Sequence, residues 1–216
     1  TEGLGSRPGG RALGTFGDAG CFSFAPSKAI TTGQGGIVVT DNDDIHCRLR
    51  GLKDQGRPMR GTRGVDDHPT LGFNFKLSNL LASVGLAQLE QLEARLEHMR
   101  DLYLWYRAGL QGVPGLAMPA FDIDGGECPQ WINVLVDRRD ELAAYLEGRG
   151  IETRKFWSPL HTQPPYRLEK VGFLNAVELS RQGLWLPSAL SVTKADVAIV
   201  CDEIREFCSR GDGSAV

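Results

Sequence analysis

An apolar stripe in the middle of the chain constrains the fold most. Apolar residues recur at positions 89, 92, 96, 99, 103, 106 and 110, with Gly85 as an acceptable first member. Their steps alternate between three and four residues, which places them on one face of an α-helix. The pattern predicts a long helix that begins after Ser78 and is ended by Val113-Pro114-Gly115. We expect it to pack on a core or to bridge two domains rather than to form a free coiled coil.

The chain before the stripe is rich in glycine and predicts short elements. Two short buried strands and one short helix are expected, over 20–24, 37–40 and 42–53. Asp41 or Asn42 would form the N-cap of that helix. The segments 1–19 and 54–72 show no periodicity and predict irregular loops.

Strands and helices alternate after the stripe. The expected strands are 131–136, 151–155 and 184–186, and the expected helices follow Asp137, cover 173–182 and follow Thr193. Asp137 is expected to cap its helix, and Gly150 to end it in a left-handed conformation. Thr193 and Asp196 have the spacing of a capping box for the last helix. The buried face of that helix would contain Val197, Val200, Cys201, Ile204 and Phe207.

This order of elements predicts an α/β chain with two domains. The first would cover residues 1–95 and the second residues 96–210, with the boundary in or just after the long helix, near 95–112. Residues 211–216 are expected to be a disordered tail.

Composition excludes several classes of protein. Hydrophobic residues make up 41% and charged residues 24% of the 216 positions, which is typical of a globular chain. A net charge of −3 argues against a dedicated nucleic-acid binder. The uncharged stretch from Leu77 to Leu89 is too short and too polar to span a membrane. Five cysteines without a Cys-x-x-Cys pair indicate a reducing compartment, so we expect a cytoplasmic protein, and four widely spaced histidines suggest no metal site.

Lys28 is the first candidate for chemistry. It lies in the polar turn region 25–36, just after the strand that Ser23 ends. Ligands of open α/β sheets bind where strands end. A lysine removed from water there can attack a carbonyl to form a Schiff base. From these residues alone, however, a surface lysine or an anion-contacting lysine is the commoner role.

Four sequence blocks, in order, resemble one enzyme family. The run GDAGCFSFAPSKAITTGQGGIVVTDND resembles the cofactor-lysine segment of the DegT/DnrJ/EryC1/StrS family. These are pyridoxal-phosphate (PLP) sugar aminotransferases with the aspartate-aminotransferase type I fold. The blocks LKDQGR, LGFNFKLSNLLASVGLAQLEQLE and RKFWSPLHTQPPY agree as well, and the last is most similar to the GDP-perosamine synthase branch. The resemblance implies part of the large domain plus a small C-terminal α/β domain.

The resemblance assigns cofactor roles to four residues. Lys28 would hold PLP as a Schiff base and move a proton between the α-carbon of the amino acid and C4′ of the cofactor. Ser23 would hydrogen-bond the PLP phosphate, and Glu2 would contact the ring near O3′. Asn74 would reach the PLP phosphate of a neighbouring subunit, which implies a homodimer with a shared active site. Ser23 could instead satisfy the end of a strand, and Asn74 could be a turn residue with positive φ.

Four further residues are assigned to the substrate. His161 and Tyr166 would line the nucleotide-sugar side, and Lys76 and Arg57 would contact the phosphates of the sugar nucleotide. The alternatives are a packed loop histidine and two solvated cations. The sequence departs from the family at two positions: Gln34 stands where Glu is common, and Lys76 stands where Arg is common.

The resemblance implies that an amino group moves from an amino acid, expected to be glutamate, to a nucleotide-linked keto-deoxysugar. One rival is a PLP or PMP sugar dehydratase, a branch in which histidine typically replaces the lysine, so Lys28 argues against it. A second rival is a non-catalytic half that only dimerises or binds sugar nucleotide. Family members are nearly twice this long, and their aspartate that pairs with the pyridinium nitrogen would fall just upstream of Thr1. These two points favour the second rival for this chain by itself.

Overall fold

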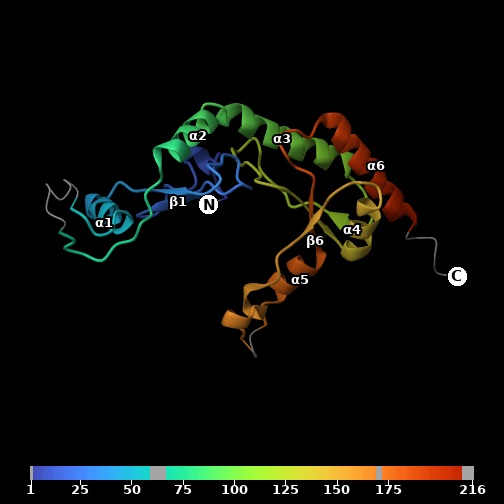
Figure 1. The fold of residues 1–216 in the computed structure, drawn as a ribbon. Helices are drawn as coiled ribbons and strands as arrows, with labels where there is room; N and C mark the ends of the chain where they lie inside the picture. The colour runs from blue at the N-terminus through green and yellow to red at the C-terminus, as the bar shows by residue number, and fades with distance from the viewer. Residues whose placement is uncertain (1, 59–66, 169–171, 211–216) are drawn as a thin grey trace. The chain divides into compact units, whose positions relative to one another are not determined.

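The computed structural model describes residues 2–58, 67–168 and 172–210 (Figure 1). The chain divides into two compact units, described separately below. The first unit contains residues 1–96 and 122–130, and the second contains residues 97–121 and 131–216. Helix α3 (Leu92–Gly109) contributes residues to both.

The expected domains, 1–95 and 96–210, remain a prediction. The tail expected over 211–216 lies outside the described residues.

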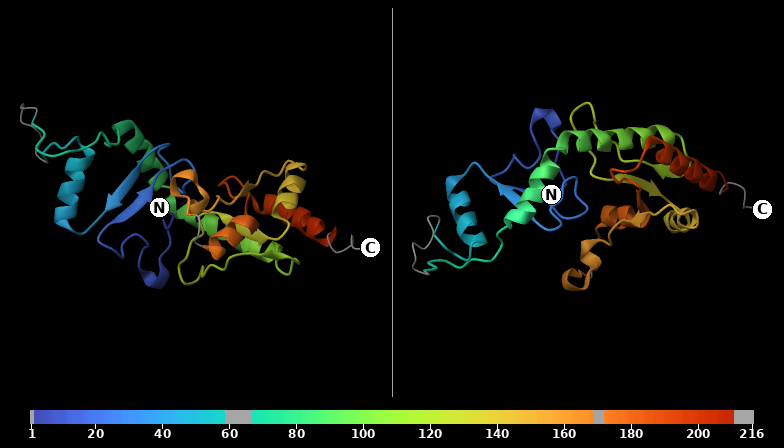
Figure 2. Two further views of the ribbon diagram at one scale, coloured as in Figure 1. Left: turned by 90° about the horizontal axis from the view of Figure 1, so that it is seen from below. Right: turned by 45° about the horizontal axis from the view of Figure 1, so that its top comes forward.

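The first unit contains a two-stranded antiparallel sheet (Figures 1 and 2). Strand β1 (Gly20–Ser23) pairs with β2 (Gly36–Val39), with Ser23 opposite Gly36. The expectation of two buried strands is wrong, because Gly20 is the one buried residue of the pair and Ile37 and Val38 are 47% and 42% exposed. An apolar run reports a tendency to be buried, but burial also needs a covering layer on each face of the sheet.

Local capping determines where the helices of this unit begin. Before α1 (Asp43–Lys53), the side chain of Asn42 accepts a hydrogen bond from the backbone N–H of Ile45 at 3.0 Å, which confirms the expected cap. Before α2 (Asn79–Leu89), Ser78 accepts from the N–H of Leu81 at 3.3 Å. Each cap satisfies a donor that the first turn leaves unpaired.

The prediction of one long helix is wrong, because the helix is interrupted between α2 and α3. The N–H of Gln91 donates to the carbonyl of Gln88, three residues back, at 3.2 Å. This tighter turn separates the last residue of α2, Leu89, from the first of α3, Leu92. The apolar steps of three and four continue across the interruption, so periodicity could not reveal it.

The second unit is built on a four-stranded antiparallel sheet in the order β3-β4-β6-β5. Its strands are β3 (Leu116–Ala117), β4 (Ile132–Val136), β5 (Arg154–Lys155) and β6 (Gly183–Leu186). The helices besides α3 are α4 (Arg139–Glu147), α5 (Leu174–Gln182) and α6 (Lys194–Arg210). Three short 3-10 turns lie elsewhere in the chain, η1 (Pro8–Gly10), η2 (Leu160–Thr162) and η3 (Pro164–Tyr166). Of these elements, β3 and the three turns were not expected.

The core of the second unit joins sheet and helices. Figures 1 and 2 show α6 beside the second half of α3, and Gly109 of α3 approaches Cys201 of α6 so closely that a Cβ there would lie 2.5 Å from the sulfur. The least exposed side chains are Leu102, Tyr103, Tyr106, Val134, Leu142, Leu146, Leu184, Val197 and Ile204. All five residues expected on the buried face of α6 are buried. Among the described residues, no helix is both long and apolar enough to cross a bilayer.

The helix ends of this unit agree with the sequence in two cases and differ in one. Thr193 and Asp196 form the expected capping box, with the N–H of Thr193 donating to Asp196 at 2.8 Å and the N–H of Asp196 donating to Thr193 at 3.2 Å. Gly150 has φ 75, as expected after α4. The expected cap at Asp137 is wrong, because its carboxylate accepts from the side-chain amide of Gln182 at 2.7 Å and α4 begins at Arg139.

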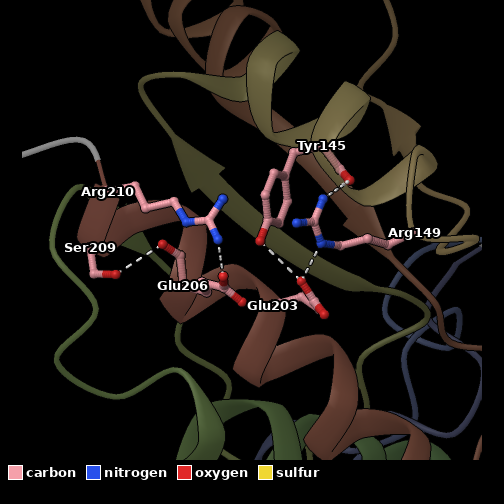
Figure 3. A network of polar contacts seen from close by, with 6 residues as sticks. All are labelled: Tyr145, Arg149, Glu203, Glu206, Ser209 and Arg210. Carbon is pink, nitrogen blue, oxygen red and sulfur yellow. Dashed lines mark hydrogen bonds and ion pairs between the residues drawn. The ribbon is translucent and has the colours of Figure 1, made fainter. Parts of the chain in front are cut away.

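A polar network ties α4 to α6 (Figure 3). The hydroxyl of Tyr145 donates to Glu203 at 3.0 Å, and Arg149 pairs with the same carboxylate at 2.6 Å. The guanidinium of Arg149 also lies 3.5 Å from the centre of the Tyr145 ring. Partial burial and the hydrogen bond to Glu203 raise the pKa of Tyr145. Arg210 and Glu206 add an ion pair on the next turn of α6.

Replacing Ile204 by alanine should lower the free energy of unfolding by about 2–5 kcal/mol, because it leaves a cavity in a close-packed core. The side chain of Ile204 is 0% exposed, whereas Ile199 on the same helix is 58% exposed. Ile199→Ala is therefore the matched control and should change the free energy by no more than about 0.5 kcal/mol. Urea unfolding followed by circular dichroism measures both, and equal losses at the two positions would contradict this packing.

Candidate functional site

The lysine loop, residues 24–35, connects β1 to β2 and is folded on itself. The N–H of Phe24 donates to the carbonyl of Gly35 at 2.9 Å, which extends the pairing of the two strands. The carbonyl of Phe24 in turn accepts from the N–H of Thr32 and the hydroxyl of Thr31, at 3.1 and 3.0 Å. The N–H of Lys28 closes a turn onto the carbonyl of Ala25 at 3.1 Å. These bonds give the backbone that carries Lys28 a defined conformation.

Helices α2 and α3 hold this loop from outside. The side-chain oxygen of Gln88 accepts from the N–H of Thr31 at 3.4 Å, and Arg95 donates to the carbonyl of Ala29 at 3.1 Å. At Gly85 the contact is closest, since a Cβ there would lie 2.9 Å from Thr32. Ala29, Ile30 and Thr32 are buried. The glycine at the start of the apolar stripe therefore allows the helix to approach the loop.

Lys28 meets Glu2. Its Nζ lies 3.1 Å from Oε1 of Glu2, and the two side chains are 11% and 48% exposed. The segment that carries Glu2 is fixed by Ser6, whose buried hydroxyl donates to the carbonyl of Cys128 and accepts from its N–H, at 3.1 and 2.9 Å. These two hydrogen bonds join residues that are 122 positions apart in the sequence, and no sequence motif signals them.

Ser23 lies at the end of β1, five residues before Lys28. Its hydroxyl oxygen accepts from the N–H of Ala25 at 3.2 Å, so it does satisfy the end of a strand. Within residues 2–58, 67–168 and 172–210, no acceptor takes the hydroxyl's own proton. Ser23 can therefore support the turn and still donate a hydrogen bond to a ligand.

A second group of candidates gathers around Asp54. Asn74 pairs with Asp54 in an isolated antiparallel bridge. Lys76 lies 2.7 Å and Arg57 3.5 Å from the same oxygen of Asp54. The hydrogen bond from Lys76 is the largest influence on this carboxyl and holds the pKa of Asp54 below its usual value.

The alternative that Asn74 is a turn residue with positive φ is wrong. Among the described residues, Gln55 is the non-glycine residue with positive φ, at 58°. The side chain of Asn74 is exposed beside its bridge partner Asp54. Sequence reasoning missed Asp54, although it stands inside the LKDQGR block three residues before Arg57. Its signal was a carboxylate at helix-turn spacing from a cation that was itself a candidate.

The last two candidates belong to the second unit. His161 lies in η2, with its ring centre 4.9 Å from that of Phe173. Tyr166 ends η3 and is 60% exposed. The candidates thus form three groups: Glu2, Ser23 and Lys28, then Asn74, Arg57 and Lys76 around Asp54, and then His161 with Tyr166.

The first group fits an aldehyde cofactor that carries a phosphate. The side chain of Lys28 is 11% exposed, and its amine lies 3.1 Å from a carboxylate oxygen of Glu2. Ser23 supplies a hydroxyl donor on the same loop. A primary amine and a phosphate donor are the two groups by which a protein would hold pyridoxal phosphate.

Comparison with known proteins identifies relatives over almost the whole chain. It is 32% identical over 212 residues to the GDP-perosamine synthase of Escherichia coli O157:H7, which covers 96% of this chain and 57% of the relative. It is 34% identical over 214 residues to the GDP-perosamine synthase of Vibrio cholerae, which covers 95% of this chain and 57% of the relative. The chain thus spans little more than half the length of these relatives.

A solved structure shows the same fold. The crystal structure of Streptomyces venezuelae DesV in complex with a ketimine intermediate matches with a TM-score of 0.84 and 31% identity, over 95% of this chain and 55% of that one. This likeness confirms the expected α/β class, the type I fold of PLP-dependent transferases. The model of the DegT/DnrJ/EryC1/StrS aminotransferase family matches residues 1–205. The chain therefore belongs to the DegT/DnrJ/EryC1/StrS aminotransferase family.

Proposed function

We propose that this chain carries the catalytic lysine of a PLP-dependent aminotransferase. The amino group would move from an amino acid, expected to be glutamate, to a nucleotide-linked keto-deoxysugar. The observation that carries the proposal is the position of Lys28: its side chain is 11% exposed and its amine lies 3.1 Å from a carboxylate oxygen of Glu2, in a loop held by two helices. Membership of an aminotransferase family supports it over a non-catalytic role.

Lys28 would both bind the cofactor and transfer protons. Bound pyridoxal phosphate supplies an electron sink that stabilises negative charge at the α-carbon of the amino acid. The Nζ of Lys28 would take and return the proton at that carbon. Glu2, whose Oε1 lies 3.1 Å from Nζ, would contact the ring near O3′. The hydroxyl of Ser23 would bind the phosphate.

The second group would bind phosphate groups. Lys76 and Arg57 are the candidates for the phosphates of the sugar nucleotide, and both lie within 3.5 Å of one oxygen of Asp54. Asn74, in the bridge with Asp54, would reach the cofactor phosphate of a second subunit, so we propose a homodimer. His161 and Tyr166 would line the nucleotide-sugar side.

The named relatives support the substrate class. Both GDP-perosamine synthases carry a nucleotide-linked sugar in their names, and the chain is also 32% identical to a dTDP-3-amino-3,4,6-trideoxy-α-D-glucose transaminase of Streptomyces venezuelae. We propose the cytoplasm as the location, since all five cysteines are free thiols.

Replacing Lys28 by arginine should abolish covalent attachment of the cofactor, because a guanidinium keeps the charge but does not form the bond. The protein is incubated with pyridoxal phosphate, the cofactor–lysine bond is reduced with borohydride, and the labelled peptide is identified by mass spectrometry. The wild-type label should lie on Lys28 alone. Lys53→Arg, on α1, is the matched control and should keep it.

A label on any other lysine, or none at all, would overturn the assignment of Lys28. Amine transfer from glutamate to GDP- and dTDP-linked ketosugars, followed by analysis of the sugar product, then tests the substrate class. A Lys28→Arg variant that still transfers the amine would rule out this mechanism.

The pKa of the Asp54 carboxyl should rise towards its usual value in Lys76→Gln. The lowered pKa means that the ion pair stabilises the folded chain above the usual carboxyl pKa and loses this effect as the pH falls through the lowered value. A carboxyl-detected NMR titration of the wild type and the variant measures the shift. Arg48→Gln removes a charge from exposed α1 and should leave the titration unchanged. An unchanged Asp54 titration in Lys76→Gln would mean that Lys76 points elsewhere in solution.

A further inference from the structure

Three tryptophans form one cluster in the second unit, which we call the tryptophan platform: Trp131, Trp157 and Trp185. The ring centres of Trp157 and Trp185 are 4.5 Å apart, and those of Trp131 and Trp185 are 5.0 Å apart. Trp131 and Trp157 complete the triangle at 5.8 Å. These separations lie in the range that aromatic pairs prefer.

The sheet places an arginine beside the platform. Arg154 of β5 is directly opposite Trp185 of β6, so the two side chains share a face of the sheet. Its guanidinium lies 5.0 Å from the centre of the Trp185 ring and 5.9 Å from that of Trp157. Phe156 supports the platform from the side, with its ring 5.6 Å from Trp185. It packs so closely on Gly183 that a Cβ there would lie 2.3 Å from the ring.

One ring of the platform is buried and another is exposed to solvent. Trp185 is 8% exposed, whereas Trp157 is 55% exposed. Leaving much of an indole in water forgoes the favourable free energy of burying it. The packing of the second unit accounts for the position of Trp157 but not for its exposed ring.

Arg154 also has no partner of opposite charge. Over the described ranges 2–58, 67–168 and 172–210, no carboxylate lies within ion-pair distance of it, although Arg139, Arg149 and Arg181 in the same unit all have one. An exposed aromatic ring and an uncompensated guanidinium thus stand side by side. Together they match a ligand that is planar and aromatic at one end and anionic at the other.

We propose that Trp157 and Arg154 bind the nucleotide part of the substrate, with the base stacked on Trp157 and a phosphate on Arg154. This inference rests on the proposed function only in taking a nucleotide-linked sugar as the substrate. Bases stack on aromatic side chains with little regard to sequence, because every base has a π-face. Arginine binds phosphate through two parallel hydrogen bonds while its flat face remains on an aromatic ring. In every nucleotide a ribose connects the base to the phosphate, so the two parts are close enough to reach the neighbouring side chains of Trp157 and Arg154.

The test measures binding of GDP to the 216-residue chain by isothermal titration calorimetry, without cofactor or amino acid. Trp157→Ala should weaken GDP binding about tenfold or more, because one base-stacking contact is lost. Trp157→Phe keeps an aromatic face and should stay within about threefold of the wild type. Trp105→Phe changes a tryptophan outside the platform and should have no effect. Thermal unfolding followed by circular dichroism checks that each variant is folded.

Pyrophosphate, which lacks a base, separates the two contacts. Arg154→Gln should weaken both GDP and pyrophosphate, whereas Trp157→Ala should weaken GDP alone. Arg205→Gln, which removes an exposed charge from α6 of the same unit, is the control and should change neither. Equal GDP affinity in the wild type and Trp157→Ala would overturn the proposal. dTDP is titrated in the same way as GDP. If the wild-type chain binds neither GDP nor dTDP, the proposal is overturned as well.

The two proposals fail in different experiments. If borohydride reduction labels Lys28 but Trp157→Ala does not change GDP affinity, the proposed nucleotide site is wrong and the aminotransferase proposal stands. If Trp157→Ala weakens GDP binding but Lys28 is not labelled, the proposed nucleotide site stands and the proposed role of Lys28 is wrong.

Discussion

The contact between the lysine loop and the two helices behind it is the constraint on which the candidate site depends. The twelve-residue loop between the two short strands pairs part of its backbone internally, and the remaining backbone groups need other partners because unpaired buried groups are costly. Gln88 and Arg95 supply two of these partners from α2 and α3. The conformation of the loop around Lys28 is therefore determined by residues some sixty positions further along the chain, and not by the loop sequence alone.

Both candidate charge clusters contain their own counter-ion. Glu2 compensates Lys28, and Asp54 compensates Lys76 and Arg57. A phosphate that binds Lys76 and Arg57 would take the place of Asp54 as their anionic partner. Such an arrangement keeps the cations oriented, and it favours ligands with enough negative charge to displace a carboxylate.

Local signals in the sequence predicted local structure well. The cap at Asn42, the capping box of Thr193 and Asp196, and the buried face of α6 were all predicted, because each depends on residues within one or two turns. The wrong predictions have one cause in common: each depends on contacts between segments that lie far apart in the sequence. The exposure of β1 and β2 depends on which layers cover them, and the bond between Ser6 and Cys128 depends on chain segments that the sequence keeps far apart. Asp137 was assigned to the wrong partner because Gln182, which competes for it, lies 45 positions away.

The close approach of Gly85 to the lysine loop makes this helix position unsuitable for a stabilising substitution. Alanine at a mid-helix glycine ordinarily stabilises a helix by roughly 1 kcal/mol, and α2 would look like a safe place for that change. Here the added methyl group would lie 2.9 Å from Thr32, a stiff, buried side chain whose hydroxyl is already bonded to the carbonyl of Gln34 at 2.7 Å. Thr32 belongs to the loop that carries Lys28, so the clash would fall on that loop. A consensus or propensity-based redesign of this helix should therefore treat Gly85 as part of the site.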